Sequence, residues 1–70
     1  MNSMIIAVFN FNNDSVDIIS VDKEYINTMY AGDIENYLSE DLQYNPDDIE
    51  FMSDVRTINF ADSDILNQVR

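Results

Sequence analysis

Met4 to Phe11, MIIAVFNF, is the clearest strand signal in the sequence. It is rich in β-branched and aromatic residues, which predicts a strand. Successive side chains of a strand point to opposite faces, and here both faces are apolar: Met4, Ile6 and Val8 on one, and Ile5, Ala7, Phe9 and Phe11 on the other. A strand that is buried on both faces usually lies in the middle of its sheet. We therefore expect a central strand.

The residues that follow predict a β-hairpin. Asn12, Asn13 and Asp14 form a turn cluster whose members tolerate left-handed backbone angles. The stretch 15–22, SVDIISVD, then predicts a second strand. The next stretch, 23–30, KEYINTMY, fits either an extension of that strand or a short helical turn, and the Ala-Gly pair after it ends either one.

A helix is predicted from Asp33 to about Gln43. Asp33 is suited to be either its N-cap or an acid in its first turn. The helix ends before Pro46, because the residue that precedes a proline avoids helical angles. Four apolar residues fall at i, i+3, i+4 and i+8 and form one stripe: Ile34, Tyr37, Leu38 and Leu42.

The rest of the chain adds one strand and two open segments. The stretch 49–53, IEFMS, predicts a third strand, and 55–60, VRTINF, is either a fourth strand or its continuation. Residues 61–70 form either one amphipathic turn or a frayed tail. Residues 1–70 thus make a single α+β domain: a small, mostly antiparallel sheet with one helix packed on a face, in the order ββαβ(β).

One helix can cover only one face of that sheet, whereas the first strand is apolar on both faces. The second face would otherwise be an exposed apolar patch. Three occupants can cover it: the C-terminal segment, a second copy of the chain, or a partner protein. The pattern therefore points to association.

The composition argues against an enzyme. Among the 70 residues there is no cysteine and no histidine, so disulfides, thiolate metal sites and the commonest general base are excluded. The serines have no histidine partner, and no glycine-rich phosphate loop is present. The acidic clusters lack the spacing and the glycine of a calcium loop. We expect no catalytic residues, no metal and no cofactor.

The net charge and the absence of long apolar runs limit where the protein is expected to lie and what it is expected to bind. Fourteen acidic and three basic residues give a net charge of −11, so direct binding to nucleic acid is disfavoured. No apolar run is long enough for a membrane span, and no positively charged leader precedes the first strand. The protein is expected to lie in the cytoplasm, without membrane contact.

The negative charge exceeds what solubility requires, which suggests that it has a function. Net charges of about 2–8 in magnitude suffice to keep a small domain soluble, and self-repulsion costs stability. Carboxylates two residues apart on a strand stand about 6–7 Å apart, close to the spacing of phosphates along an extended nucleic-acid strand. An acidic surface of this kind could occupy a groove built for phosphates. Plain solubility is the alternative.

In size, charge and lack of catalytic groups, the whole chain resembles the small acidic proteins that phages and mobile elements make against host defences, such as nucleic-acid mimics and anti-CRISPR proteins. The resemblance implies an inhibitor that binds a basic nucleic-acid-binding protein, such as a CRISPR nuclease, in the host cytoplasm. The alternative is a self-associating structural or regulatory module, such as a homodimer, whose acids only confer solubility. Exposure and clustering select these candidate partner-binding residues: Glu35, Glu40, Tyr44, Asp47, Asp48 and Glu50.

Overall fold

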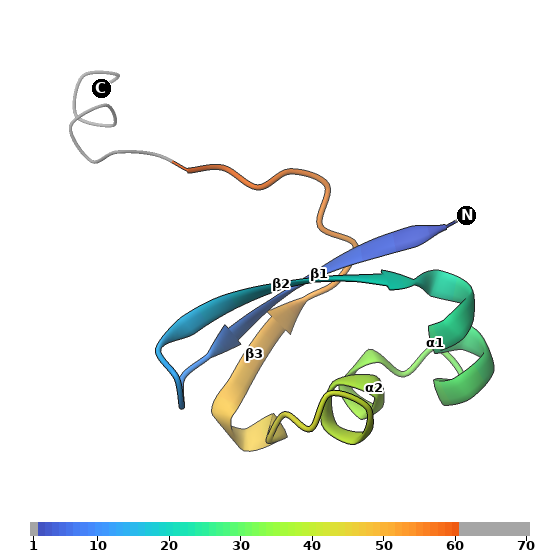
Figure 1. Ribbon diagram of the computed structural model, residues 1–70, viewed down its shortest axis with the longest axis horizontal. Helices are drawn as coiled ribbons and strands as arrows, with labels where there is room; N and C mark the ends of the chain where they lie inside the picture. The colour runs from blue at the N-terminus through green and yellow to red at the C-terminus, as the bar shows by residue number, and fades with distance from the viewer. Residues whose placement is uncertain (1, 61–70) are drawn as a thin grey trace.

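Strand β1 (Ser3–Asn10) lies in the middle of a three-stranded antiparallel sheet of order β2-β1-β3 (Figure 1). The structure is a computed structural model that describes residues 2–60. β1 pairs along its whole length with β2 (Ser15–Asp22) and along its second half with β3 (Ile49–Met52). The predicted central strand and the predicted hairpin are both confirmed.

A buried asparagine closes the hairpin. Asn10 ends β1 and is buried on the core face. Its side-chain oxygen accepts hydrogen bonds from the backbone N–H groups of Asn12 (3.1 Å) and Asn13 (3.2 Å). Asp14 then takes the left-handed conformation (φ 53°) that the turn requires. The polar side chain inside the core is thus satisfied by the turn that it builds.

Residues 23–30, which fitted either an extended strand or a helical turn, form a helix, α1 (Lys23–Tyr30). Asp22, the last residue of β2, caps its N-terminus by accepting a hydrogen bond from the N–H of Glu24 (2.9 Å). At the other end Ala31 (φ 52°) and Gly32 (φ 81°) both adopt left-handed angles, which stops the helix. The N-cap and the two left-handed residues after the helix, rather than intrinsic propensity, determine that residues 23–30 are helical.

The predicted helix is present but shorter. In α2 (Ile34–Glu40), Asp33 accepts a hydrogen bond from the N–H of Asn36 (3.1 Å), which confirms the predicted cap. The helix ends three residues before Gln43, because the chain turns there through a left-handed angle (φ 64°). A single 3₁₀ turn, η1 (Pro46–Asp48), leads into β3.

Two features of the predicted order are therefore corrected. The structure has two helices between the second and third strands, where one was expected. Within residues 53–60 there is no fourth strand, because the chain turns at Asp54 (φ 54°) and only one backbone bond continues the ladder, from the Val55 N–H to the Ile5 carbonyl (3.0 Å). The alternatives for residues 61–70 lie outside the described residues.

The core joins one face of the sheet to both helices. Its buried side chains form one cluster: Met4, Ile6 and Val8 of β1, Ile26 of α1, and Tyr37 and Leu38 of α2. Figure 1 shows both helices on the same side of the sheet, and residues 53–60 leaving on the opposite side. Neither helix in the described part of the chain is long and apolar enough to cross a membrane.

Candidate functional site

Exposed carboxylates gather on the elements that cover the core. We call this surface the acidic helical side and define it by six exposed residues on α1, α2, η1 and the turns on either side of α2: Glu24, Asp33, Glu35, Glu40, Asp41 and Asp47. Three of the predicted residues, Glu35, Glu40 and Asp47, belong to it. The fold thus brings acids from separate parts of the sequence onto one side of the sheet (Figure 1).

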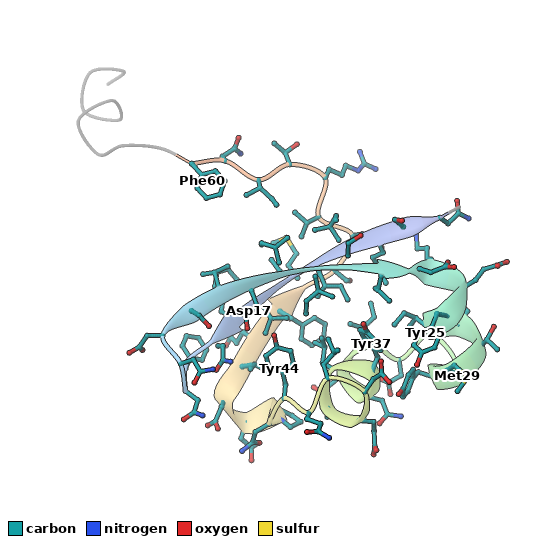
Figure 2. The ribbon with its side chains drawn as sticks, in the orientation of Figure 1. Asp17, Tyr25, Met29, Tyr37, Tyr44 and Phe60 are labelled. Carbon is teal, nitrogen blue, oxygen red and sulfur yellow. The ribbon has the colours of Figure 1, made fainter. Side chains whose placement is uncertain are left out.

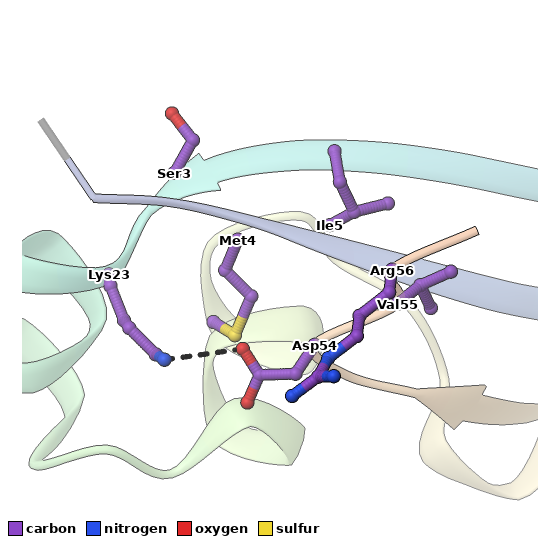
Figure 3. Close-up of a pocket in the computed structure, with 7 residues that line it drawn as sticks. All are labelled: Ser3, Met4, Ile5, Lys23, Asp54, Val55 and Arg56. Carbon is purple, nitrogen blue, oxygen red and sulfur yellow. Dashed lines mark ion pairs between the residues drawn. The ribbon is translucent and has the colours of Figure 1, made fainter.

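These carboxylates have no cationic partners among residues 2–60. The one ion pair in that range joins Lys23 Nζ to Asp54 Oδ1 at 3.3 Å. It lies in a shallow groove of about 400 Å³ beside the start of β1, where Arg56 also lines the wall (Figure 3). Both described cations therefore lie at this groove, and the negative charge of the helical side remains uncompensated there.

The C-terminal end of α2 carries the wrong charge for stability. A helix C-terminus carries a partial negative charge that favours cations, yet α2 ends at Glu40 with Asp41 as its C-cap, and neither helix has a basic residue in its last turn. Each such acid costs about 0.3–1 kcal/mol. Acidic residues at this position therefore oppose folding, which favours a use for them outside the fold.

Replacing Glu40 by lysine is expected to stabilise the protein by about 0.5–1 kcal/mol, because the cation complements the helix end. The measurement is urea denaturation followed by circular dichroism. Glu50→Lys is the matched control, since it makes the same change in net charge at an exposed position of β3. Equal stabilisation by both variants would mean that only the overall charge matters.

An aromatic cluster stands beside these acids. The rings of Tyr25, Tyr30 and Tyr37 contact one another edge to face, with centroids 5.7–6.2 Å apart. Tyr37 is buried, as its place in the apolar stripe predicts. The Tyr25 hydroxyl donates a hydrogen bond to Asp41 (3.2 Å), and burial, with the charge of Asp41, raises the pKa of Tyr25 above its ordinary value. The cluster holds a neutral phenol in place at the surface.

Tyr25 and Met29 were not selected from the sequence, although both are exposed on α1 (Figure 2). They put an apolar anchor next to the carboxylates of the acidic helical side, a combination typical of protein interfaces. The available signal was the spacing of seven residues between Tyr30, Tyr37 and Tyr44, with Tyr25 just before them. This spacing could not be interpreted while residues 23–30 fitted either a strand or a helical turn.

Tyr44 is held inside the molecule more than the sequence suggested. Its ring is half-buried against the core, and its hydroxyl donates a 2.7 Å hydrogen bond to Asp17 of β2. Burial, together with the adjacent carboxylate, raises the pKa of Tyr44 to about 12. The same hydrogen bond is the main cause that lowers the pKa of Asp17. Tyr44 therefore ties the loop after α2 to the hairpin.

Tyr44→Phe is expected to raise the pKa of Asp17 toward the ordinary aspartate value, because the carboxylate loses its main donor. The stabilisation from this hydrogen bond is present above the unfolded pKa of Asp17, near 4, and is lost as the pH falls through the lower folded value. At high pH it is lost between about 10 and the Tyr44 pKa of about 12. NMR titration of the Asp17 carboxyl carbon measures the shift, and an unchanged pKa would contradict it.

The two remaining predicted residues occupy different surroundings. Asp48 is half-buried in η1, and its backbone carbonyl accepts a hydrogen bond from the Phe11 N–H (2.9 Å). Glu50 alternates with the core-facing Ile49 and Phe51, so its side chain leaves the sheet on the face away from the helices. The structure therefore separates Glu50 from the acidic helical side.

The described residues contain no group of three or more side chains able to hold a metal ion. A scan of protein-family models, a search of curated proteins and a search of solved structures each returned no match.

Proposed function

We propose that the protein is a non-enzymatic inhibitor that binds a basic nucleic-acid-binding effector, such as a CRISPR nuclease, through the acidic helical side, and so competes with nucleic acid. The observation that carries this proposal is the set of uncompensated carboxylates on α1, α2 and η1, placed next to the exposed Tyr25 and Met29. The carboxylates would steer the approach of the partner, and the two apolar side chains would anchor the complex.

Solubility alone explains the placement of these acids less well than recognition of a partner does. A solubilising surface needs charge of either sign anywhere, whereas these acids include two at the C-terminal end of α2, where they oppose the helix dipole. The aromatic cluster also keeps Tyr25 exposed in a fixed position, which solubility does not require. Both features favour a surface that is used for recognition.

A competition assay tests the proposal. Purified guide-loaded CRISPR nucleases are mixed with a fluorescently labelled DNA duplex, and its anisotropy is followed as the protein is added. We expect the DNA to be displaced from at least one nuclease, and the displacement to weaken steeply between about 50 and 500 mM salt as the charges are screened. Retention of the DNA by every nuclease, or displacement that is independent of salt, would contradict competition through charge.

A further inference from the structure

The face of the sheet turned away from the helices is apolar and open. We call it the open face and define it by the exposed or half-exposed residues that alternate with the core residues: Ile5, Ala7, Phe9, Phe11, Val16, Ile18 and Met52. The register sets two rows across it, Ile18–Ala7–Met52 and Val16–Phe9–Glu50. No helix or strand among residues 2–60 covers these rows (Figure 1).

Few charges lie on this face among residues 2–60. Glu50 is the charged side chain within the two rows, and Asp22 lies at the end of β2, opposite Ser3. The acids of the acidic helical side lie beyond the core. Two chains of charge −11 repel each other least when these faces meet, because their helical sides then point outward. Sheets pack about 10 Å apart, so the two acidic sides would be separated by more than the Debye length of about 8 Å.

The segment after β3 adds to the open face. We call residues 55–60 the arm. It leaves the sheet on the side of the open face (Figure 1), and its backbone forms no strand. Phe60 is 93% exposed and Ile58 is 44% exposed (Figure 2 shows Phe60 away from the sheet). An extended arm with two large apolar side chains is suited to contact a second molecule.

The area is consistent with a dimer when the arm takes part. With roughly 150–250 Å² per large side chain, the exposed fractions of Phe9, Phe11, Val16, Ile18 and Met52 leave on the order of 500 Å² per copy. Two such faces bury about 1,000 Å², the lower bound for a specific interface. With Ile58 and Phe60 of both arms the total reaches about 1,600 Å², the standard size.

We propose that the open face and the arm form the interface of a homodimer, in which two sheets stack face to face and each arm lies against the other copy. A basic partner would be drawn to the acidic helical side rather than to this face, which carries few charges. Residues 61–70 offer three large apolar residues beside two acids, too little to replace a second sheet.

The test compares two methionines of equal exposure. Met52 on the open face and Met29 on α1 are each 60% exposed, so Met52→Lys and Met29→Lys make the same change on opposite sides of the molecule. Sedimentation equilibrium of the full chain at about 1–100 µM measures the dimer. We expect Met52→Lys to raise the dimer dissociation constant at least about tenfold and Met29→Lys to leave it unchanged. Phe60→Ser, beyond the last strand, is expected to weaken the dimer without disturbing the sheet.

Several outcomes would overturn the proposal: a monomeric wild type, a Met52→Lys variant that dimerises normally, or equal loss in both methionine variants. For a monomeric wild type, peroxide oxidation followed by mass spectrometry tells the other occupants apart. Slower oxidation of Met52 than of Met29 would assign the face to residues 61–70, and equal oxidation to a foreign partner. The salt dependence distinguishes the dimer from the proposed function. Added salt strengthens a dimer of like-charged chains, because it screens their repulsion, whereas it weakens binding to a basic effector.

Discussion

Replacing Leu38 by alanine is expected to remove about half of the free energy of unfolding of the protein. Leu38 is fully buried (0% exposed) in a core that, among residues 2–60, holds six apolar side chains. Truncation of a buried leucine costs about 2–5 kcal/mol, and a domain of this size has a total stability of about 4–10 kcal/mol. Because the core is so small, neighbouring side chains cannot fill the cavity. Urea denaturation followed by far-UV circular dichroism measures the loss.

Leu42→Ala is the matched control. Leu42 lies one turn further along the predicted apolar stripe, but it is 39% exposed because α2 ends before it. Its truncation is expected to cost less than about 1 kcal/mol. A comparable loss in both variants would show that the stripe continues past the end of α2, and that the core is larger than the six buried residues.

The sequence was informative where one signal dominated. The run from Met4 to Val8 is apolar at every position, and that continuity alone indicates a central strand. The short polar turn after it leaves an antiparallel hairpin as the simplest connection. Asp33 is also a local signal, since an N-cap depends on only the next three residues. Each of these predictions is confirmed.

The sequence was ambiguous where local preferences balanced. In residues 23–30 the tyrosines, isoleucine and threonine favour a strand, while lysine, glutamate and methionine favour a helix. Asp22 decides the outcome by capping the first turn, although its place at the end of a predicted strand concealed that role. Leu42 shows the converse case, because periodicity continued beyond the point where the chain turns.

The candidate site was predicted only as far as exposure could be inferred. Glu35, Glu40 and Asp47 lie on the acidic helical side, but Glu50 faces the other way, because one residue along a strand changes the face. Tyr44 bonds to Asp17, a contact across 27 positions that no local pattern reveals. Long-range contacts of this kind determine which predicted residues remain available to a partner.

Reversing the charges of Glu35 and Glu40 to lysine is expected to weaken binding to the effector about tenfold for each residue and about 100-fold together, tenfold being about 1.4 kcal/mol. Charges at the rim of an interface act mainly on the association rate, so surface plasmon resonance at low and high salt should place the loss in that rate. Glu50→Lys is the control, with the same change in net charge on the open face. Because Glu50 lies in the proposed dimer interface, the variants are compared at a concentration where sedimentation gives them the same oligomeric state.

The comparison of Glu40→Lys with Glu50→Lys distinguishes binding through a specific surface from nonspecific attraction to the net negative charge. Equal losses of affinity would mean that the effector responds only to net charge. No loss of affinity in either variant would mean that charge does not contribute to recognition. A selective loss for Glu40→Lys cannot result from unfolding, because the same substitution is expected to stabilise the end of α2. A variant that gains stability while losing affinity would show that these carboxylates serve binding at the expense of the fold.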